Sequence, residues 1–499
     1  MKKKAIYHNL FGSISNFAFL FITSIILLPY YFKFINEFEY GIWLGGISFL
    51  SLLAVLEANI SLILTQKLGS KWVSNEPLEF SRYLSSAIFI GILISIMIVA
   101  FALFAKGDLY RWVSKKEVID PIFTYSFLIY SVSIAVTIVS GFFNSITQVF
   151  LRTFWTPVFN LVGSIAGIVV TIIYIPKYGV LALALGNLIK GLINGVLVII
   201  YAVKLLKEKN IHFSFQLNYA NEFIKNIRLP FVSKMGMTTA TTLQNFIVAS
   251  SVSASATTVF DITRKLPIIT VMLLNMIAVS SFTSFSLYYS ESQEKNEKHA
   301  YTNYYFSTMK VILLIGVFIV FLFGKDFTLV WVGSDKFGGD TLLAMICLVA
   351  IGDLLRQMLS QQYYAIGNFK LTSTTEIIFA ISFIIGAFFL IPVFELYGIV
   401  LASILANIFY FIICYFLEKN SKISMVSSIV NFSLVKDVVF LLFLAIICKG
   451  LIIYLGLSLI GSFLIAFFFI GIVLLYFYSN NKPLFNFIKA QVLNSIKVR

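Results

Sequence analysis

YIPKYGVLALAL (residues 174–185) and LIPVFELYGIVLAS (residues 390–403) share one order of features. In each, an apolar segment ends at Ile-Pro, and a Tyr-Gly pair then opens a second apolar segment rich in small residues. A tight basic link precedes each copy, FLRTFW at residues 150–155 and IGNFKL at residues 366–371. The two copies lie about 216 residues apart, which indicates an internal repeat spanning most of the chain.

The composition is that of an integral membrane protein. Of the 499 residues, 59% are hydrophobic and 12% are charged, and the mean hydropathy is +0.94, whereas soluble domains carry about 25% charged residues. The net charge of +15 lies mainly in short loops, so anchoring at the cytoplasmic membrane face explains it and no nucleic-acid partner is expected. The three cysteines have neither metal-ligand nor disulfide spacing.

Apolar stretches of about 20 residues are long enough to cross a hydrocarbon core of about 30 Å. They predict an all-α integral membrane fold of about fourteen transmembrane helices, at residues 10–32, 41–64, 84–105, 121–150, 155–176, 178–203, 229–252, 257–289, 302–324, 341–366, 372–392, 396–417, 433–457 and 459–479. The repeat divides these into two pseudo-symmetric six-helix bundles and two extra helices. The predicted domains are an N-lobe (1–210), a C-lobe (211–420) and a C-terminal part (421–499) with helices 13 and 14 and a cytoplasmic tail.

Basic residues orient the predicted spans. On this map 22 of the 37 Lys and Arg residues fall on the side of the two termini, 8 fall on the opposite side, and the rest lie within spans. Lys and Arg concentrate on the cytoplasmic side, so both termini are expected to be cytoplasmic. The 106–120 loop departs from this bias, because it carries four of the eight.

Charged side chains in the hydrocarbon cost about 2.5–3.5 kcal/mol each and normally face a bundle interior or a watery cavity. The set considered within the predicted spans is Glu57, Lys190, Lys234, Arg264, Lys265, Lys310, Asp353, Arg356, Glu376 and Lys449. Among these, Lys190, Lys310 and Lys449 sit singly and are expected to snorkel to the interface. The others require individual interpretation.

The span at 229–252 is the least apolar. Lys234, Thr238, Thr241 and Asn245 are spaced by 4, 3 and 4 residues and form one stripe along a helix. Hydroxyl groups in membrane helices often bond to a carbonyl of their own preceding turn, but that does not account for the Lys and Asn. A polar stripe that lines a cavity is therefore the favoured interpretation.

The span at 257–289 begins with VFDITRKL (259–266). Asp261 lies three and four residues before Arg264 and Lys265, so it can neutralise one of them, and Lys265 is the expected partner. Arg264 shares a helical face with Asn275, which indicates a polar edge facing a cavity. The alternative from the residues alone is anchoring at the outer interface.

Two further features involve acidic groups. Asp353 and Arg356 are three residues apart and are expected to form an ion pair, more readily structural than functional. Glu57 is a lone carboxylate late in its span: a proton or cation site, a partner for a distant cation, or a solvated group near the cytoplasmic edge. Glu57, Asp353 and Arg356 are thus candidate coupling or cavity charges.

No phosphate-binding loop, catalytic carboxylate pair, metal cluster or nucleophile motif occurs in the sequence. A transporter is therefore expected rather than an enzyme, and no cofactor is predicted. The coupling ion, H⁺ or Na⁺, is left open.

The chain resembles the polysaccharide (O-antigen and capsule) flippases of the multidrug/oligosaccharidyl-lipid/polysaccharide (MOP) exporter superfamily. The resemblance rests on the fourteen-helix plan, the repeat, EYGIW (39–43), VFDITRKL and the two Ile-Pro elements. It implies two lobes in a V around a cationic cavity, alternating access, and an undecaprenyl-diphosphate-linked oligosaccharide as substrate. It also implies the bacterial cytoplasmic membrane as location, with membrane lipids and the pathway's polymerase and chain-length proteins as partners.

By this resemblance, Arg264 and Lys265 would contact the diphosphate or sugar acids. The other candidate substrate-binding residues are Lys234, Thr238, Thr241, Asn245 and Asn275. Residues 10–32 contain no Arg or Lys, and in this the chain departs from the peptidoglycan-precursor flippases related to that family. This departure favours an O-antigen or capsule unit over the cell-wall precursor.

Two alternatives remain at this stage. A cation-coupled multidrug exporter of the same superfamily usually carries a carboxylate in its first helix, and residues 10–32 contain none. A membrane polysaccharide polymerase would carry a large external loop with basic residues and His, whereas His8, His212 and His299 all map to the predicted cytoplasmic side. Both alternatives are therefore less favoured than a flippase.

Overall fold

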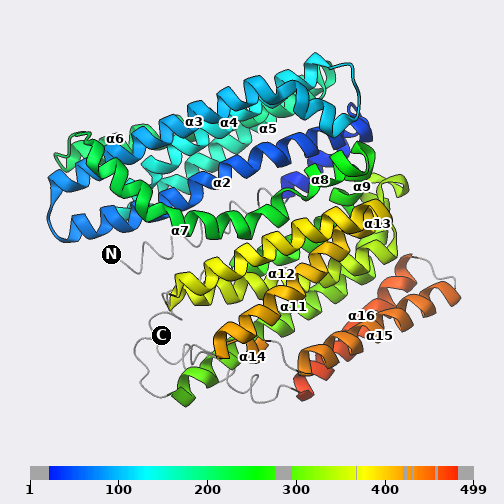
Figure 1. The fold of residues 1–499 in the computed structure, drawn as a ribbon. Helices are drawn as coiled ribbons and strands as arrows, with labels where there is room; N and C mark the ends of the chain where they lie inside the picture. Colours follow the sequence, from blue (N-terminus) through cyan, green and yellow to red (C-terminus); the bar gives the residue numbers. More distant parts are fainter. Residues whose placement is uncertain are drawn as a thin grey trace. The chain divides into compact units, whose positions relative to one another are not determined.

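The computed structural model describes residues 19, 22–276, 295–366, 368–419, 425–429, 432–455 and 459–480. Nearly all of them are helical, and no strand occurs in these ranges (Figure 1). Seven described helices are long and apolar enough to cross a membrane. The predicted all-α membrane fold is confirmed, whereas the number of spans, fourteen, stays a prediction.

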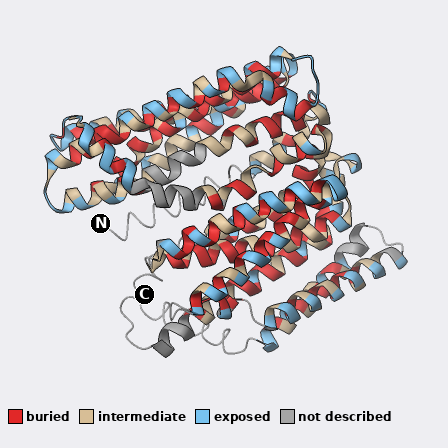
Figure 2. Cartoon of the chain, viewed as in Figure 1, coloured by how far each residue is buried: buried red, intermediate tan, exposed pale blue. Residues whose placement is uncertain are grey.

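Contacts divide the chain into two compact units, Met1–Asp261 with Ile391–Ile399, and Ile262–Leu390 with Val400–Arg499. These bounds differ from those of the predicted lobes, which remain a prediction. Each unit has its own interior, and buried positions lie on the faces where its helices meet (Figure 2). Exposed apolar side chains such as Phe104 and Phe388 suit a surface in contact with lipid.

The first unit begins with a helix at Ile22–Tyr31. It continues with α2 (Glu37–Val73), α3 (Pro77–Ser114), α4 (Pro121–Val149), α5 (Trp155–Tyr178), α6 (Val180–Glu208), α7 (Leu217–Thr242), α8 (Gln244–Ser251) and most of α9 (Ala254–Thr263). α4 packs against α2, α3 and α6, while α2 also packs against α7 and α8. α5 and α6 approach closely at Gly167 and Gly186, where an added Cβ atom would come within 3 Å of the opposing carbonyl oxygen. Such small residues permit tight helix packing in membranes.

The second unit contains a helix at Lys265–Met276. It continues with α11 (Lys295–Val332), a short 3-10 turn η1 (Ser334–Lys336), α12 (Asp340–Ala365), most of α13 (Phe369–Lys419), α14 (Val426–Ile429), α15 (Phe432–Tyr454) and α16 (Leu459–Asn480). α11 packs against α12, α14, α15 and α16, and α15 packs against α16. The two extra helices predicted after the repeat are therefore α15 and α16, and both contact α11.

Helix starts follow local capping chemistry. Asn36 Oδ1 accepts from Glu39 N at 2.9 Å, and Glu39 Oε2 accepts from Asn36 N at 3.1 Å, which is a capping box at the start of α2. At the start of α4, the Asp120 carboxylate accepts from Ile122 N at 2.8 Å, and Pro121 is the first helical residue. These local signals fix where the spans begin.

The observed helices differ from the predicted spans most clearly at three places. α3 continues to Ser114, so most of the predicted 106–120 loop is helical. The predicted helix at 229–252 starts earlier and is interrupted at Leu243, between α7 and α8. The predicted helix at 257–289 is divided at Arg264, between α9 and the helix Lys265–Met276. Hydropathy measures apolar length and does not detect such interruptions, because the residues on both sides remain apolar.

The Ile-Pro repeat has a common backbone geometry. Gly179, three residues after Pro176, has φ 50° and ψ −124°, and Glu395, three residues after Pro392, has φ 49° and ψ −122°. Gly179 separates α5 from α6, and Glu395 interrupts α13. The positive φ suits glycine and strains a residue that has a Cβ atom, so the second copy carries strain that the first avoids.

We therefore expect opposite effects from exchanging these residues. Gly179→Ala should lower stability by about 1 kcal/mol, whereas Glu395→Gly should raise it by up to about 1 kcal/mol. No atom lies within 4 Å of the position of a Cβ at Gly179, so the effect there comes from the backbone alone. Thermal unfolding of the purified protein in detergent measures both. Gly69→Ala is the control, because Gly69 is helical and equally open; equal effects at positions 69 and 179 would contradict the account.

Candidate functional site

Polar side chains gather around the interruption between α7 and α8 in the first unit. The Thr242 carbonyl, at the end of α7, accepts a hydrogen bond from the Ser48 hydroxyl of α2. Thr241 Oγ1 donates to the Thr238 carbonyl oxygen at 3.1 Å, and both side chains are half-buried. The Thr241 hydroxyl is therefore satisfied within its own helix, while α2 satisfies the carbonyl at the break.

A buried pair links α8 to α9 in the same unit. Asn245 Nδ2 donates to Asp261 Oδ1 at 3.1 Å, and the two residues are 7% and 6% exposed. The predicted stripe on the seventh helix thus ends at a carboxylate of VFDITRKL. Lys234 and Glu57 belong to described helices, but their side chains lie outside the described residues. Their predicted roles stay predictions.

Arg264 stands at the turn between α9 and the helix Lys265–Met276, and it is 8% exposed. Its carbonyl accepts from Ile268 N at 3.0 Å, which starts the next helix. On the preceding residue, Thr263 Oγ1 accepts from Gly338 N at 2.9 Å and ties this turn to the loop before α12. Burial of Arg264 is inconsistent with a fully solvated surface anchor.

Lys265 and Asn275 are half-buried. Asn275 Oδ1 is a buried oxygen that accepts no hydrogen bond from the described residues. The face shared by Arg264 and Asn275 also includes Val271, which is buried. Arg264 is thus buried and Asn275 half-buried, and the polar edge that they are predicted to share, like their contact with a substrate, stays a prediction.

A larger polar group lies in the second unit, inside apolar helices. It is named here the buried charge cluster and consists of Asp353, Arg356 and Ser360 on α12 and Glu376, Asn407 and Tyr410 on α13. Arg356 Nη1 donates to Glu376 Oε2 at 2.5 Å, and both side chains are 0% exposed. The closest partner of Arg356 is therefore 20 residues away in sequence.

Other contacts complete the buried charge cluster. Arg356 Nη2 lies 3.7 Å from Asp353 Oδ1, so the predicted pair exists but is the longer of the two. The Ser360 hydroxyl donates to Glu376 Oε1 and lies 2.9 Å from the Tyr410 hydroxyl. The guanidinium Cζ is 3.9 Å from the centre of the Phe379 ring, a cation–π contact.

Two lysines predicted to snorkel are paired instead. Lys310 Nζ on α11 lies 2.9 Å from Asp437 Oδ2 on α15, and both side chains are nearly buried. Lys449 Nζ on α15 lies 2.5 Å from Asp340 Oδ1 at the start of α12. These ion pairs hold α15 to α11 and α12. Local sequence patterns do not predict them, because the partners in each pair lie more than a hundred residues apart.

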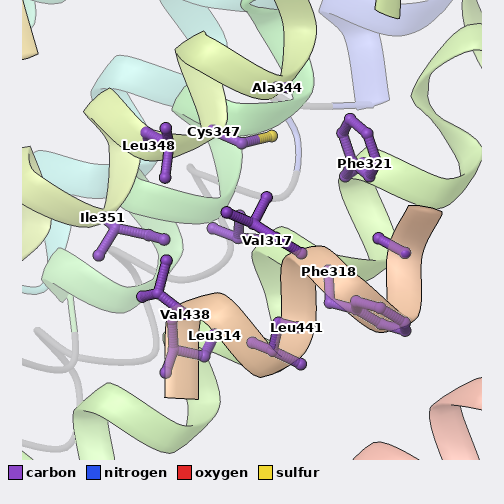
Figure 3. A pocket seen from close by; sticks show the side chains of 12 residues that line it. Leu314, Val317, Phe318, Phe321, Ala344, Cys347, Leu348, Ile351, Val438 and Leu441 are labelled. Carbon is purple, nitrogen blue, oxygen red and sulfur yellow. The ribbon is translucent and has the colours of Figure 1, made fainter. Parts of the chain in front are cut away.

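Between α11, α12 and α15 lies an apolar pocket (Figure 3). Its lining is aliphatic and aromatic, with the Cys347 thiol as its most polar side chain, and includes Val317, Phe318 and Leu441. This lining offers no partner for a phosphate or a sugar. The described residues contain no group of three or more His, Cys, Asp or Glu side chains placed to hold a metal ion.

Reasoning from sequence missed the partners in the buried charge cluster. Glu376 was recognised as a charge within a span, but its pairing with Arg356 was not, and Ser360, Asn407 and Tyr410 were not singled out. A carboxylate and a guanidinium in adjacent apolar spans are an available signal, because each is costly alone. The three-residue spacing of Asp353 and Arg356 predicts a pair that the structure contains, but it gives no indication of the closer contact between Arg356 and Glu376.

Comparisons place the chain among transporters. A family model described as lipid II flippase MurJ matches residues 52–474. No curated protein matches the sequence. A solved lipid II flippase MurJ in an inward closed conformation has a TM-score of 0.71 at 16% identity, covering 94% of this chain and 98% of its own.

Other solved structures share the fold less closely. An inward-facing multidrug resistance MATE family transporter of the MOP superfamily has a TM-score of 0.60 at 14% identity, covering 81% of this chain and 99% of its own. A MOP superfamily transporter from Pyrococcus furiosus has a TM-score of 0.60 at 15% identity. The match covers 85% of this chain and 97% of the transporter. At such identities these likenesses show the fold alone.

The buried charge cluster generates a stability prediction. Arg356→Met should destabilise the protein by about 3–5 kcal/mol, because it leaves Glu376 and Asp353 buried without their cation. Thermal unfolding in detergent measures the change. Arg111→Met is the matched control, since Arg111 pairs with Asp108 at an exposed site and should change stability by at most about 1 kcal/mol. Equal shifts for the two variants would show that the buried pairs do not hold α12 to α13.

Proposed function

Because the chain belongs to the family of the lipid II flippase MurJ, we propose that it carries a lipid-linked saccharide from the cytoplasmic to the outer leaflet of a bacterial cytoplasmic membrane. Members of this family are transporters, and the chain is a transporter rather than an enzyme. The observation that carries the proposal is the family match over residues 52–474, which covers most of the membrane region. Transport proceeds by alternating access, with both termini in the cytoplasm.

The chemistry of such a substrate fits the candidate residues. A polyprenyl diphosphate is a concentrated anion, which Arg and Lys bind most strongly. Arg264 is buried at a helix interruption, where a guanidinium can meet a diphosphate with little competition from water. Lys265 and Lys234 are the further proposed anion contacts. Hydroxyl and amide groups, namely those of Thr238, Thr241, Asn245 and Asn275, suit sugar hydroxyls.

The saccharide itself has two candidates. The family model favours lipid II, the substrate named for its members. The absence of Lys and Arg from residues 10–32 favours an O-antigen or capsule-type oligosaccharide on undecaprenyl diphosphate. We propose the oligosaccharide, with the polymerase and chain-length proteins of its pathway as partners. The MATE-like fold leaves a multidrug exporter as the alternative, which the lack of Asp and Glu in residues 10–32 disfavours.

Deletion of the gene separates these candidates. Lipid-linked oligosaccharide should accumulate in the inner leaflet of the deletion strain, and the surface polysaccharide should disappear while the cell wall is made normally. If lipid II accumulates and the cells lyse, the proposed substrate is wrong and the cell-wall precursor takes its place. The assignment of the protein as a flippase is then unaffected. Increased drug sensitivity with neither lipid accumulating would overturn the flippase assignment.

Arg264 is the residue on which the proposed binding depends most. Arg264→Ala should lower the rate of flipping at least a hundredfold, while the amount of protein in the membrane stays at the level of the unaltered protein. Loss of two charge-assisted hydrogen bonds to a diphosphate, about 1.5–3 kcal/mol each, sets this scale. Complementation of the deletion strain measures it, with Arg111→Ala at an exposed position as control. Full complementation by Arg264→Ala would show that Arg264 is not part of the substrate-binding site.

A further inference from the structure

The buried charge cluster contains one carboxylate more than its cation can neutralise. Arg356 supplies one positive charge, while Asp353 and Glu376 supply two negative charges when both are ionised. The cluster lies between α12 and α13, and both helices are apolar enough to span a membrane. An unbalanced charge at such a position is costly. One of the two carboxyl groups is therefore expected to be neutral, or to hold a cation.

The contacts identify which carboxyl group stays ionised. Both Glu376 oxygens accept hydrogen bonds, one from Arg356 and one from Ser360, and the side chain is 0% exposed. These charge-assisted bonds favour the carboxylate form. Asp353 lies farther from the guanidinium, at 3.7 Å, and its side chain is 14% exposed. Asp353 is thus both the weaker partner of Arg356 and the one a proton can reach.

Asn407 supplies an independent indication that Asp353 carries a proton. Its Nδ2 donates to Asp353 Oδ1 at 3.1 Å and to the Ser403 carbonyl oxygen at 3.0 Å. Its Oδ1, in a residue 5% exposed, is a buried acceptor with no hydrogen-bond donor among the described residues. A carboxylic acid and a primary amide can bond reciprocally, because the acid O–H donates to the amide oxygen. A proton on Asp353 supplies the donor that Asn407 Oδ1 lacks.

The backbone is shaped to bring these groups together. Gly352 precedes Asp353, and a Cβ atom there would lie 2.9 Å from Asn407 Cγ. Only a glycine lets the amide approach α12 this closely. Arg356 Nε and Nη2 also make no hydrogen bond with the described residues, so the guanidinium keeps donor capacity on the side of Asp353.

Among the described side chains of α11, α13 and α15, no other charged group supplies the missing positive charge. On α13, Glu376 adds a negative charge and Tyr410 a neutral hydroxyl bonded to Ser360. Lys310 on α11 is paired with Asp437, and Lys449 on α15 is paired with Asp340. We propose that the carboxyl group of Asp353 is a proton-binding site, loaded in the conformation described here. We further assign this proton as the coupling ion of transport, and this assignment rests on the proposed function.

Infrared spectroscopy of the full-length protein in lipid tests the site directly. The carbonyl stretch of a protonated carboxylic acid is separate from amide and carboxylate bands, and it should disappear reversibly as pH rises. In protein labelled with ¹³C at the aspartate side-chain carboxyl, this band should shift. It should be absent in Asp353→Asn and retained in Asp108→Asn, whose side chain is 60% exposed. A band that ignores the aspartate label, or survives in Asp353→Asn, would overturn the proposal.

Glu376→Gln and Na⁺ sharpen this test. In Glu376→Gln the remaining charges of Arg356 and Asp353 balance, so the band should appear only at a lower pH than in the unaltered protein. An unchanged pH dependence would contradict the charge balance on which the site rests. Loss of the band on addition of Na⁺ at constant pH would assign the site to Na⁺ and overturn the proton assignment.

Coupling is read out separately, in liposomes that contain a labelled lipid-linked saccharide. A proton gradient across the liposome membrane should accelerate translocation by the unaltered protein, and Asp353→Asn should abolish that acceleration. The same acceleration in Asp353→Asn would overturn the coupling role. If no translocation occurs at all, the proposed function fails, while the infrared band still decides whether Asp353 binds a proton.

Discussion

Every charge inside a hydrocarbon layer has to find its partner within the protein, and this constraint determines how the second unit is held together. Arg356 and Glu376 form a fully buried pair between α12 and α13, and Lys310–Asp437 and Lys449–Asp340 attach α15 to α11 and α12. Removing one member of a buried pair costs far more than the pair itself contributes. The helices of this unit are thus joined by a few polar contacts within extensive apolar packing.

The same constraint acts on the backbone, because a helix interrupted in the membrane exposes carbonyl groups that need donors. The Ser48 hydroxyl satisfies the Thr242 carbonyl at the break between α7 and α8. Arg264 occupies a second interruption, and Gly179 and Glu395 occupy two more with nearly identical dihedral angles. Thr241 and Asn245 lie within two residues of the break at Leu243, and Arg264 and Lys265 lie at the next break, where polar groups are already required.

Much of the fold follows from one-dimensional patterns. Apolar length predicted α4, α5, α6, α12, α15 and α16 to within a few residues, since each is bounded by local signals such as Asp120-Pro121 or Gly179. The repeat was visible because its Ile-Pro elements impose the same backbone geometry twice. Pairings between distant residues were not predictable: the spacing of Asp353 and Arg356 suggested a local pair, while the closer contact joins Arg356 to Glu376 on another helix. Local periodicity reports neighbours on one helix and carries no information on which helices meet.

The central claim is that the chain moves a lipid-linked saccharide between membrane leaflets, and translocation by the purified protein tests it most directly. Liposomes would contain a polyprenyl-diphosphate saccharide labelled with a fluorophore that an external, membrane-impermeant reductant bleaches. With the protein present, bleaching should proceed beyond the outer leaflet's share until nearly all the label is lost. Bleaching that stops at that share, as in protein-free liposomes, would contradict the account.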